Sequence, residues 1–291
     1  MFLECNSGLY TNSLHKPKIV FMKSNKPERV KVVVPVYTDK LTPFEIISLN
    51  RLNEVLGSYQ VVFVLPKSLS REKFTAACPS AQFESFPDSY FDGIKAYNTL
   101  MMSRIFYERF LDCEYILIYQ LDCYIFRDEL DLWCSNDYDY IGAPWIKRAV
   151  YDLPVIKSYM KLSRLLTKLT GKPDRQELFN RVGNGGLSLR KVKSHINFID
   201  NHPSVVERFI KARHYHLYNE DVFWSIEVNK HPGVPFSYPD HITALNFSFD
   251  KHPGYCYKLN GNRLPFGCHS WSQKKMIGFW RGIILKDNND K

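Results

Sequence analysis

Three continuous apolar runs stand out in the first half of the chain. They are rich in β-branched and aromatic residues, and they span residues 30–37 (VKVVVPVY), 59–66 (YQVVFVLP) and 115–122 (YILIYQLD). Runs of this length and composition are typical of parallel strands that are buried on both faces of a sheet. We therefore expect three buried strands, the last of which ends on a carboxylate, Asp122.

Apolar residues recur at helical spacing between these runs. The pattern predicts a short strand at residues 81–86 and helices at residues 43–56, which Gly57 ends, 69–77 and 92–111. Strands that alternate with helices at this spacing predict an α/β fold with a central, mainly parallel sheet flanked by helices. Ligands of such sheets bind beyond the carboxyl ends of the strands, which is where Asp122 is expected.

The pattern changes after Trp145. Residues 147–172 carry seven Lys or Arg and one Asp, a local charge of +6. The segment has helical spacing, with Lys157, Lys161, Arg164 and Lys168 on one stripe and apolar residues elsewhere. Two interpretations are open: the apolar side packs on the core with the basic face in water, which is the more frequent arrangement, or the helix lies on an anionic membrane surface.

Composition narrows the partners and the compartment. The formal charge of +9 favours polyanions such as nucleic acid, anionic lipid or phosphorylated small molecules, but no helix-turn-helix, zinc-finger or RNP signature supports nucleic acid. The chain has seven cysteines, which is an odd number, and no two of them are spaced as CxxC. Both facts favour reduced thiols over a framework of disulfide bonds. The chain start is a poor signal peptide, and no segment approaches the ~20 apolar residues of a membrane span. We expect a cytoplasmic protein, with peripheral contact at the inner face of the membrane as a further expectation.

Four short segments carry candidate chemistry. They are Gln120-Leu121-Asp122, Gly183-Asn184-Gly185-Gly186, Glu220-Asp221, and His269 within Phe266–Trp271. A carboxylate at a strand end can bind a hard divalent cation, although such an aspartate also commonly caps a turn. Each of the other segments also has an ordinary structural explanation when it is taken singly. The glycines are compatible with a tight turn, Glu220-Asp221 with a helix N-terminus, and His269 with an ordinary polar residue.

In this order the four segments resemble the GT-A glycosyltransferases, and most closely the poorly characterised glycosyltransferase-like proteins of bacterial polysaccharide gene clusters. The resemblance covers about residues 30–272. It implies a GT-A-like (Rossmann-like) fold with a mixed, mainly parallel sheet and a basic helical insertion. It also implies that Asp122 and His269 bind Mn²⁺ or Mg²⁺. Gln120 stands where the family usually has the first Asp of its Asp-x-Asp motif, so a direct metal contact from Gln120 is in doubt.

The resemblance further implies which residues contact the nucleotide-sugar donor. The candidates are Pro35, Tyr37, Thr38, Lys95, Asn98, Arg104, Gln120, Asn184, Gly185 and Gly186. Stacking of Tyr37 on a nucleobase and packing of Tyr37 on the next helix are about equally favoured.

The adjacent carboxylates Glu220 and Asp221 are the candidates for acceptor binding and for the catalytic base. Adjacent residues on a helix diverge by about 100°, so we expect only one to face the ligand. We favour Asp221, which shares a face with Ser225 and Val228 at α-helical spacing, and we assign Glu220 to the helix N-terminus.

The function that follows is metal-dependent transfer of a sugar from a nucleoside diphosphate sugar, with UDP favoured, to a glycan or lipid-linked acceptor in surface polysaccharide synthesis. A non-catalytic sugar- or nucleotide-binding module of the same fold is the alternative, and a nucleic-acid-binding protein is less favoured. Within one domain we expect an N-terminal arm (1–29), a nucleotide-binding half (30–145), a basic helical insertion (146–180) and an acceptor-binding half with the tail (181–291).

Overall fold

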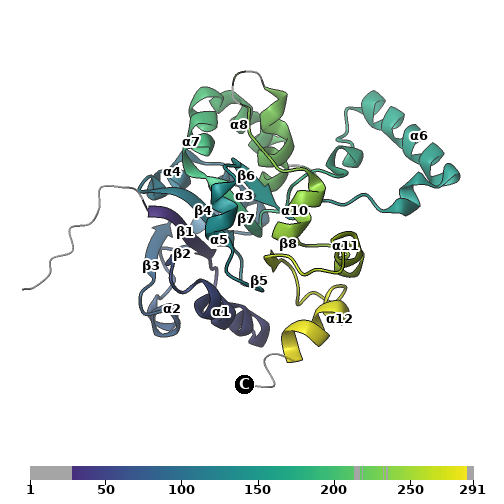
Figure 1. Cartoon of the computed structure of the whole chain (residues 1–291). Helices are drawn as coiled ribbons and strands as arrows, with labels where there is room; N and C mark the ends of the chain where they lie inside the picture. The colour runs from purple at the N-terminus through teal and green to yellow at the C-terminus, as the bar shows by residue number, and fades with distance from the viewer. Residues whose placement is uncertain (1–27, 213–216, 218, 232, 234, 287–291) are drawn as a thin grey trace, which may run out of the picture.

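The computed structural model describes residues 28–286, apart from residues 213–216, 218, 232 and 234 (Figure 1). Most of the predicted N-terminal arm, residues 1–27, lies outside the described residues, and residues 28–29 begin the first strand.

A six-stranded sheet forms the centre of the molecule, with the strand order β3-β2-β1-β4-β7-β6. Strands β3, β2, β1 and β4 are parallel, β7 is antiparallel to β4, and β6 is antiparallel to β7. The strands are β1 (Glu28–Pro35), β2 (Gln60–Pro66), β3 (Gln82–Phe86), β4 (Cys113–Tyr119), β6 (Tyr140–Gly142) and β7 (Leu187–Lys191). The predicted mixed, mainly parallel sheet is confirmed.

The core lies on both faces of this sheet. The apolar residues of β1, β2 and β4 are buried almost completely, as expected for strands that helices cover on both sides. The helices are α1 (Pro43–Leu56), α2 (Glu72–Ala77), α3 (Ile94–Met101), α4 (Arg104–Tyr107), α5 (Leu130–Ser135), α6 (Pro154–Thr170), α7 (Val192–Asn201), α8 (Pro203–Lys211), α9 (Glu220–Val222), α10 (His241–Phe247), α11 (Pro253–Leu259) and α12 (Ile277–Trp280). In Figure 1, α1 and α2 lie below the sheet and α7 and α8 above it.

The predicted helix at residues 92–111 is wrong as a single element. It is divided into α3, α4 and a 3₁₀ turn at Glu108–Phe110. The N–H of Ser103 donates to the carbonyl of Leu100 three residues back, which tightens the last turn of α3, and Ser103 itself is extended (φ −100°, ψ 145°). The break lets Tyr107 turn inward, where its hydroxyl donates to the carbonyl of Met101.

A second, three-stranded sheet joins the C-terminal part of the chain to the first half. Its order is β5 (Tyr124–Ile125), β9 (Gly267–Cys268) and β8 (Ser248–Phe249). The strand β9 pairs antiparallel with β5 and parallel with β8. A second apolar cluster, centred on Trp271 and Trp280, packs beside this sheet.

The insertion after β6 contains α6, which projects from the body of the molecule (Figure 1). None of the 17 residues of α6, all of them described, is buried. The interpretation that this helix packs its apolar side on the core is therefore wrong. The helix contacts its own return segment instead: Gln176 donates to the carbonyl of Met160, and Arg164 pairs with Asp174 at 3.0 Å.

Two properties of the whole described chain concern its cysteines and the apolar character of its helices. All six cysteines in the described residues are buried and free of disulfide bonds, whereas Cys5 lies outside them. Over the same residues, no helix combines the length and the apolar character needed to span a bilayer.

Candidate functional site

The candidate site lies at the carboxyl ends of β1 and β4. These strands are neighbours in the sheet, but β2 and β3 extend from one side of β1 and β4 lies on its other side. Such a reversal of strand order opens a crevice in which α/β proteins bind ligands. Two adjoining hollows occupy it, a larger one of about 840 Å³ and a smaller one of about 240 Å³. Both are lined by Tyr37 and Gln120.

Asp122 reaches this crevice from a tight turn and not from the strand itself. The strand β4 ends at Tyr119, three residues earlier than predicted. The N–H of Cys123 donates to the carbonyl of Gln120 at 2.9 Å and closes the turn. The N–H of Gln120 donates to the carbonyl of Gly186 at 3.0 Å. The turn is therefore also bonded to residues 183–186, which we call the glycine segment.

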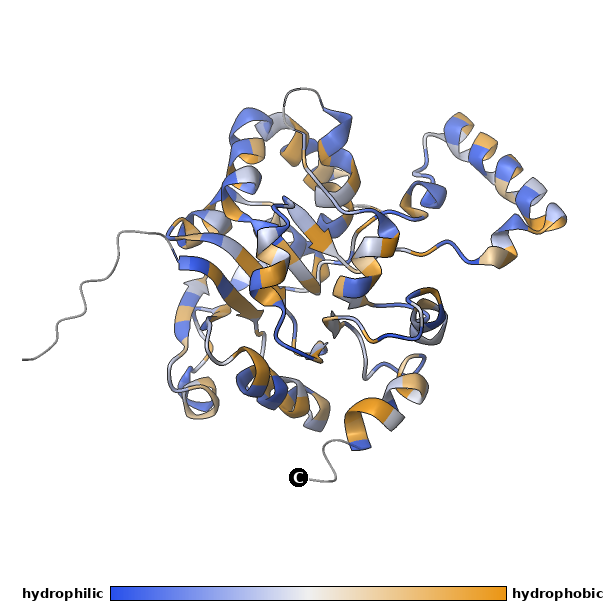
Figure 2. Cartoon of the chain, viewed as in Figure 1, coloured by the Kyte–Doolittle hydropathy of each residue, from blue (hydrophilic) through white to orange (hydrophobic). Residues whose placement is uncertain are grey.

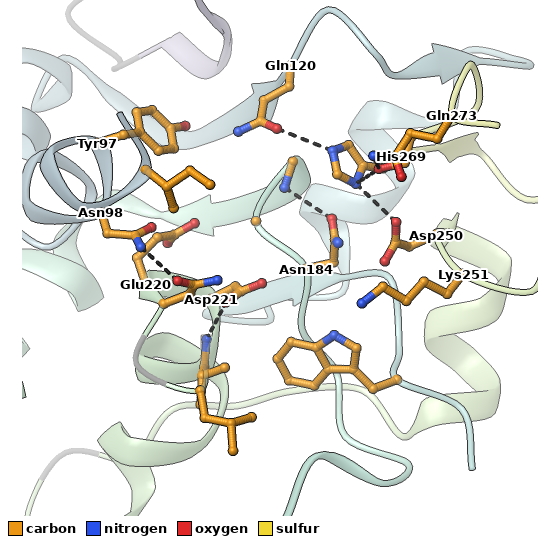
Figure 3. Close-up of a pocket in the computed structure, with 18 of the residues that line it drawn as sticks. Tyr97, Asn98, Gln120, Asn184, Glu220, Asp221, Asp250, Lys251, His269 and Gln273 are labelled. Carbon is orange, nitrogen blue, oxygen red and sulfur yellow. Dashed lines mark hydrogen bonds and ion pairs between the residues drawn. The ribbon is translucent and has the colours of Figure 1, made fainter. Parts of the chain in front are cut away.

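The small sheet brings His269 to this turn. His269 directly follows β9, whose partner β5 begins two residues after Asp122. The imidazole Nε2 lies 3.1 Å from Asp122 Oδ1. It also lies 3.2 Å from Gln120 Oε1 (Figure 3). Two segments that are far apart in the sequence, Gln120–Asp122 and His269, therefore converge on one point.

Asp250 completes the cluster, and the sequence analysis did not identify it. It directly follows β8, and its Oδ1 accepts from His269 Nδ1 at 3.2 Å (Figure 3). A carboxylate behind an imidazole fixes the orientation of the ring and raises its basicity, as is usual for metal-binding histidines. The one available signal was that Asp250 directly follows a short aromatic segment, Phe247-Ser248-Phe249.

The charges of this cluster shift one another's protonation. Burial alone would lower the pKa of His269, but the negative charges and hydrogen bonds of Asp122 and Asp250 outweigh it and raise the pKa to about 10. Burial alone would raise the pKa of Asp122, but the charge of His269 and its hydrogen bonds lower it. The two side chains therefore form an ion pair.

The residues present fit a divalent cation. Ligand atoms of Asp122, Cys123 and His269 lie within 4.8 Å of one another. Cys123 is a poor ligand, because its thiol donates to the carbonyl of Gly186 and burial raises its pKa well above the ordinary value. Asp122 Oδ1 is 3.1 Å from His269 Nε2, so a cation bound between them would replace the proton that the two side chains share. A carboxylate oxygen, an imidazole nitrogen and the amide oxygen of Gln120 form a donor set that suits Mn²⁺ better than Mg²⁺.

The glycine segment lets two functional side chains lie against its backbone. A Cβ on Gly186 would lie 2.1 Å from His269 Nε2, and a Cβ on Gly185 would lie 1.9 Å from Glu220 Oε1. Asn184 has φ = 56°, and its side-chain oxygen accepts from the N–H of Gly186 at 3.2 Å. Glycine is required at these two positions because side chains of the protein itself lie against the backbone there.

Glu220 has a partner other than the one we expected. Its two carboxylate oxygens lie 2.9 Å from the two terminal nitrogens of Arg190, and both side chains are buried. Arg190 also donates to Tyr107 and to Ser188. Glu220 is the first residue of α9, as expected, but its carboxylate is held in a buried ion pair with Arg190 of β7.

Asp221 lines the larger cavity beside Glu220 (Figure 3). Burial and then the charge of Glu220 raise its pKa to about 7. The predicted face that Asp221 shares with Ser225 and Val228 does not hold, because α9 ends at Val222 and Phe223–Glu227 forms a π-helix with a different spacing.

The donor candidates divide into those at the crevice and those away from it. Residues lining one or both hollows are Pro35, Tyr37, Thr38, Asn98, Gln120, Asn184, Gly185 and Gly186. Tyr37 is 46% exposed and makes edge contacts with Phe91 and Tyr97, which leaves ring surface toward the hollows. Asn98 is buried and donates to Asn219 Oδ1 at 3.0 Å.

Lys95 and Arg104 are not brought to the site. Lys95 is exposed on α3, and Arg104 pairs with Glu108 and with Asp200 of α7. Neither is among the described residues that line the hollows. The cation that does reach the larger cavity is Lys251, which the sequence analysis did not identify and which directly follows Asp250 (Figure 3).

Comparison with known proteins supports the fold and identifies the family. Residues 80–269 match the model of a family described as "Protein of unknown function (DUF5672)". No curated protein sequence matches the chain. A solved structure of the galactosyltransferase LgtC in complex with donor and acceptor sugar analogues is similar, with a TM-score of 0.51 and 13% identity over 89% of this chain and 95% of that chain. The apo form of mouse xyloside xylosyltransferase 1 has a TM-score of 0.50 and 14% identity over 83% of this chain and 97% of that chain.

At such identities the likeness to solved structures shows the fold alone, which is the GT-A glycosyltransferase fold expected from the sequence. The family match extends over more than half of the 291 residues. The chain therefore belongs to the DUF5672 family and has a GT-A fold.

Proposed function

We propose that the chain is a glycosyltransferase that moves a sugar from a nucleoside diphosphate sugar, with UDP as the nucleotide, to a hydroxyl of a glycan or lipid-linked acceptor. The observation that carries the proposal is the convergence of Asp122, His269 and Gln120 at the β1–β4 crevice, beside a cavity of about 840 Å³. The two similar solved structures named above are glycosyltransferases, which supports the same reading.

Asp122 and His269 would hold a divalent cation, Mn²⁺ or Mg²⁺, with Asp250 orienting the imidazole. Bound there, the cation supplies neutralisation of the negative charge that develops as the diphosphate leaves. Lys251 adds a second positive charge at the same cavity. The exposed surface of Tyr37 suits stacking on the nucleobase in the smaller hollow.

Asp221 is the proposed base. Its pKa of about 7 suits a carboxylate that accepts the proton of the acceptor hydroxyl near neutral pH, as an inverting reaction requires. In a retaining reaction the same carboxylate orients a sugar hydroxyl. Glu220, which is held by Arg190, supports the cavity floor and does not transfer a proton. The role in surface polysaccharide synthesis and the cytoplasmic location stay predictions from the sequence.

The test is Mn²⁺-dependent release of the nucleoside diphosphate from a panel of nucleotide sugars, with the wild type and Asp122→Asn compared. We expect turnover with at least one UDP-sugar and loss of at least about 100-fold in the variant, because one formal charge of the metal site is removed while the packing is kept. Asp131→Asn, an exposed aspartate on α5, is the matched control.

Three outcomes contradict the proposal in different ways. Equal rates for the wild type and Asp122→Asn at limiting Mn²⁺ would show that Asp122 does not hold the metal. Donor binding without turnover favours the non-catalytic module of the same fold, which Gln120 in place of the usual Asp keeps open. Absence of binding by every nucleotide sugar removes the proposal altogether.

A further inference from the structure

The insertion helix α6 exposes an unusual amount of apolar surface. We define its apolar stripe as Val155, Tyr159, Leu162, Leu166 and Leu169, each between 51% and 82% exposed. These residues recur at the spacing i, i+4, i+7, i+11 and i+14, so they form one continuous face about 21 Å long. Figure 2 shows the orange positions along this projecting helix, away from the body of the molecule.

A basic face lies opposite the apolar stripe. Lys157, Lys161, Arg164 and Lys168 follow the stripe at an offset of two residues, which is about 200° around the helix. Residues 153–173 carry five basic residues and no acidic residue. The segment therefore combines an uncovered apolar face with a concentrated positive charge.

A third face of α6 already has a partner. Ile156, Met160, Ser163 and Thr167 are half-buried on the side of the return segment. Because the helix is anchored along this face, its apolar stripe and its basic face lie on the two flanks, and both stay exposed.

The described part of the C-terminal segment gives a contrast to α6. The C-terminal segment 271–286 is also basic and aromatic, but it buries Trp280 and Ile284 in the second apolar cluster. The fold therefore covers one amphipathic basic helix and leaves the other uncovered.

We propose that α6 docks on an anionic phospholipid membrane, with its apolar stripe in the interfacial layer and its basic residues beside the lipid phosphates. An apolar face combined with Lys and Arg on a solvated face is the pattern of helices that lie in the membrane plane. Each basic residue near an anionic leaflet adds attraction, whereas a second copy of α6 would offer these basic residues no acidic partner.

Docking through α6 places the cavity near the lipid surface. The insertion leaves the body at Trp145 and returns through Leu178, and both residues line the larger cavity. The rim of the cavity is therefore joined directly to the docking helix. This proposal does not depend on the catalytic one, since it can be measured without metal or nucleotide sugar.

The experiment is flotation of the full chain with phosphatidylcholine vesicles, with and without phosphatidylglycerol. We expect binding to the anionic vesicles alone. Leu162→Ser with Leu166→Ser should weaken partitioning at least about tenfold, because two leucines of the stripe no longer enter the interface. Lys157→Glu with Lys161→Glu should weaken it by roughly fivefold or more for each lysine.

Matched variants elsewhere on the surface separate a specific surface from general stickiness. Leu132→Ser with Leu259→Ser and Lys193→Glu with Lys258→Glu make the same changes at exposed positions of other helices and should leave partitioning unchanged. Because no residue of α6 is buried, the stripe variants should keep the wild-type melting temperature.

Three results would overturn the proposal. The first is absence of binding to anionic vesicles by the wild type. The second is equal partitioning of the wild type and the Leu162→Ser, Leu166→Ser variant, which would mean that the stripe does not enter the membrane. The third is a dimer in sedimentation that the same variant converts to a monomer, which would mean that a second copy covers the stripe.

Discussion

The carboxyl group of Asp221 lies in the cavity with a pKa of about 7, because burial and the charge of Glu220 both disfavour its ionised form. A base acts when it is deprotonated, so kcat/KM should rise as the pH increases through about 7 and level off above it. A pH–rate profile of the wild type checks this expectation. A profile in which kcat/KM does not rise through this pH range would show that Asp221 is not the base. The control variant Asp131→Asn should give the wild-type profile.

The same shift has a consequence for stability. The folded pKa of Asp221 lies above its ordinary value of 3.8, so the folded state binds more protons than the unfolded state between these two values. The free energy of unfolding contributed by this group therefore falls as the pH rises through that window. Urea unfolding of Asp221→Asn should show higher stability than the wild type at pH 8, with the difference shrinking toward pH 4. A pH-independent difference would contradict this linkage.

Glu220 should matter more for folding than for chemistry. Replacing Glu220 by Ala leaves the guanidinium of Arg190 buried without its carboxylate, which typically costs about 3–5 kcal/mol. Urea unfolding of Glu220→Ala measures the loss, and Glu108→Ala, whose pair with Arg104 is half-exposed, should lose far less. A loss of about 1 kcal/mol or less would restore the helix-dipole role expected from the sequence.

At the scale of elements, the turn at residues 183–186 determines how closely His269 can approach Asp122. A Cβ at Gly186 would overlap the imidazole, so Gly186→Ala should displace the ring and weaken Mn²⁺ binding by about ten- to a hundredfold while the fold is kept. Calorimetric titration with Mn²⁺ measures this, and Gly278→Ala, which meets no described atom within 4 Å, is the control. Unchanged affinity would show that the ring does not hold the metal.

Elements with a strong local signal could be predicted from the sequence. The strands β1, β2 and β4 are long apolar runs, and α1 begins at a capping box formed by Thr42 and Glu45. The break at Ser103 could not be predicted, because helical periodicity continues across it and the inward turn of Tyr107 depends on tertiary packing.

Site residues whose position depends on distant pairing could not be found in the same way. The strands β8 and β9 have two residues each, too few for any periodic pattern, yet their pairing places Asp250 beside His269. Likewise, helical spacing favoured Asp221 over Glu220 for a reason that the π-helix removes, and the contact that distinguishes the two carboxylates is the pair of Glu220 with Arg190, on another element. The order of the motifs along the sequence was enough to select Asp122 and His269 as candidates. Asp250 and Arg190, which contact the candidate residues, could be identified only in the folded structure.

At the scale of the whole molecule, the insertion closes on itself. The N–H of Trp145 donates to the carbonyl of Arg181, and the N–H of Asn180 donates to the carbonyl of Trp145, both at 2.9 Å. Replacing residues 146–179 by a short Asn-Gly turn should therefore keep the body folded and shift the melting temperature by no more than about 4 °C. Removal of residues 277–286, which include the buried Trp280, should lower it much further. Collapse of the first variant would show that the insertion supports the body.

This closed stem, formed where Pro144 bridges to Val182, has an evolutionary consequence. The free energy of closing a loop grows only with the logarithm of its length, so doubling the inserted segment adds about 0.6 kcal/mol. Mutations that lengthen, shorten or rewrite α6 therefore leave the sheet and the turn at Asp122 almost untouched. Selection on the surface that α6 presents and selection on the chemistry at Asp122 can proceed separately within one gene.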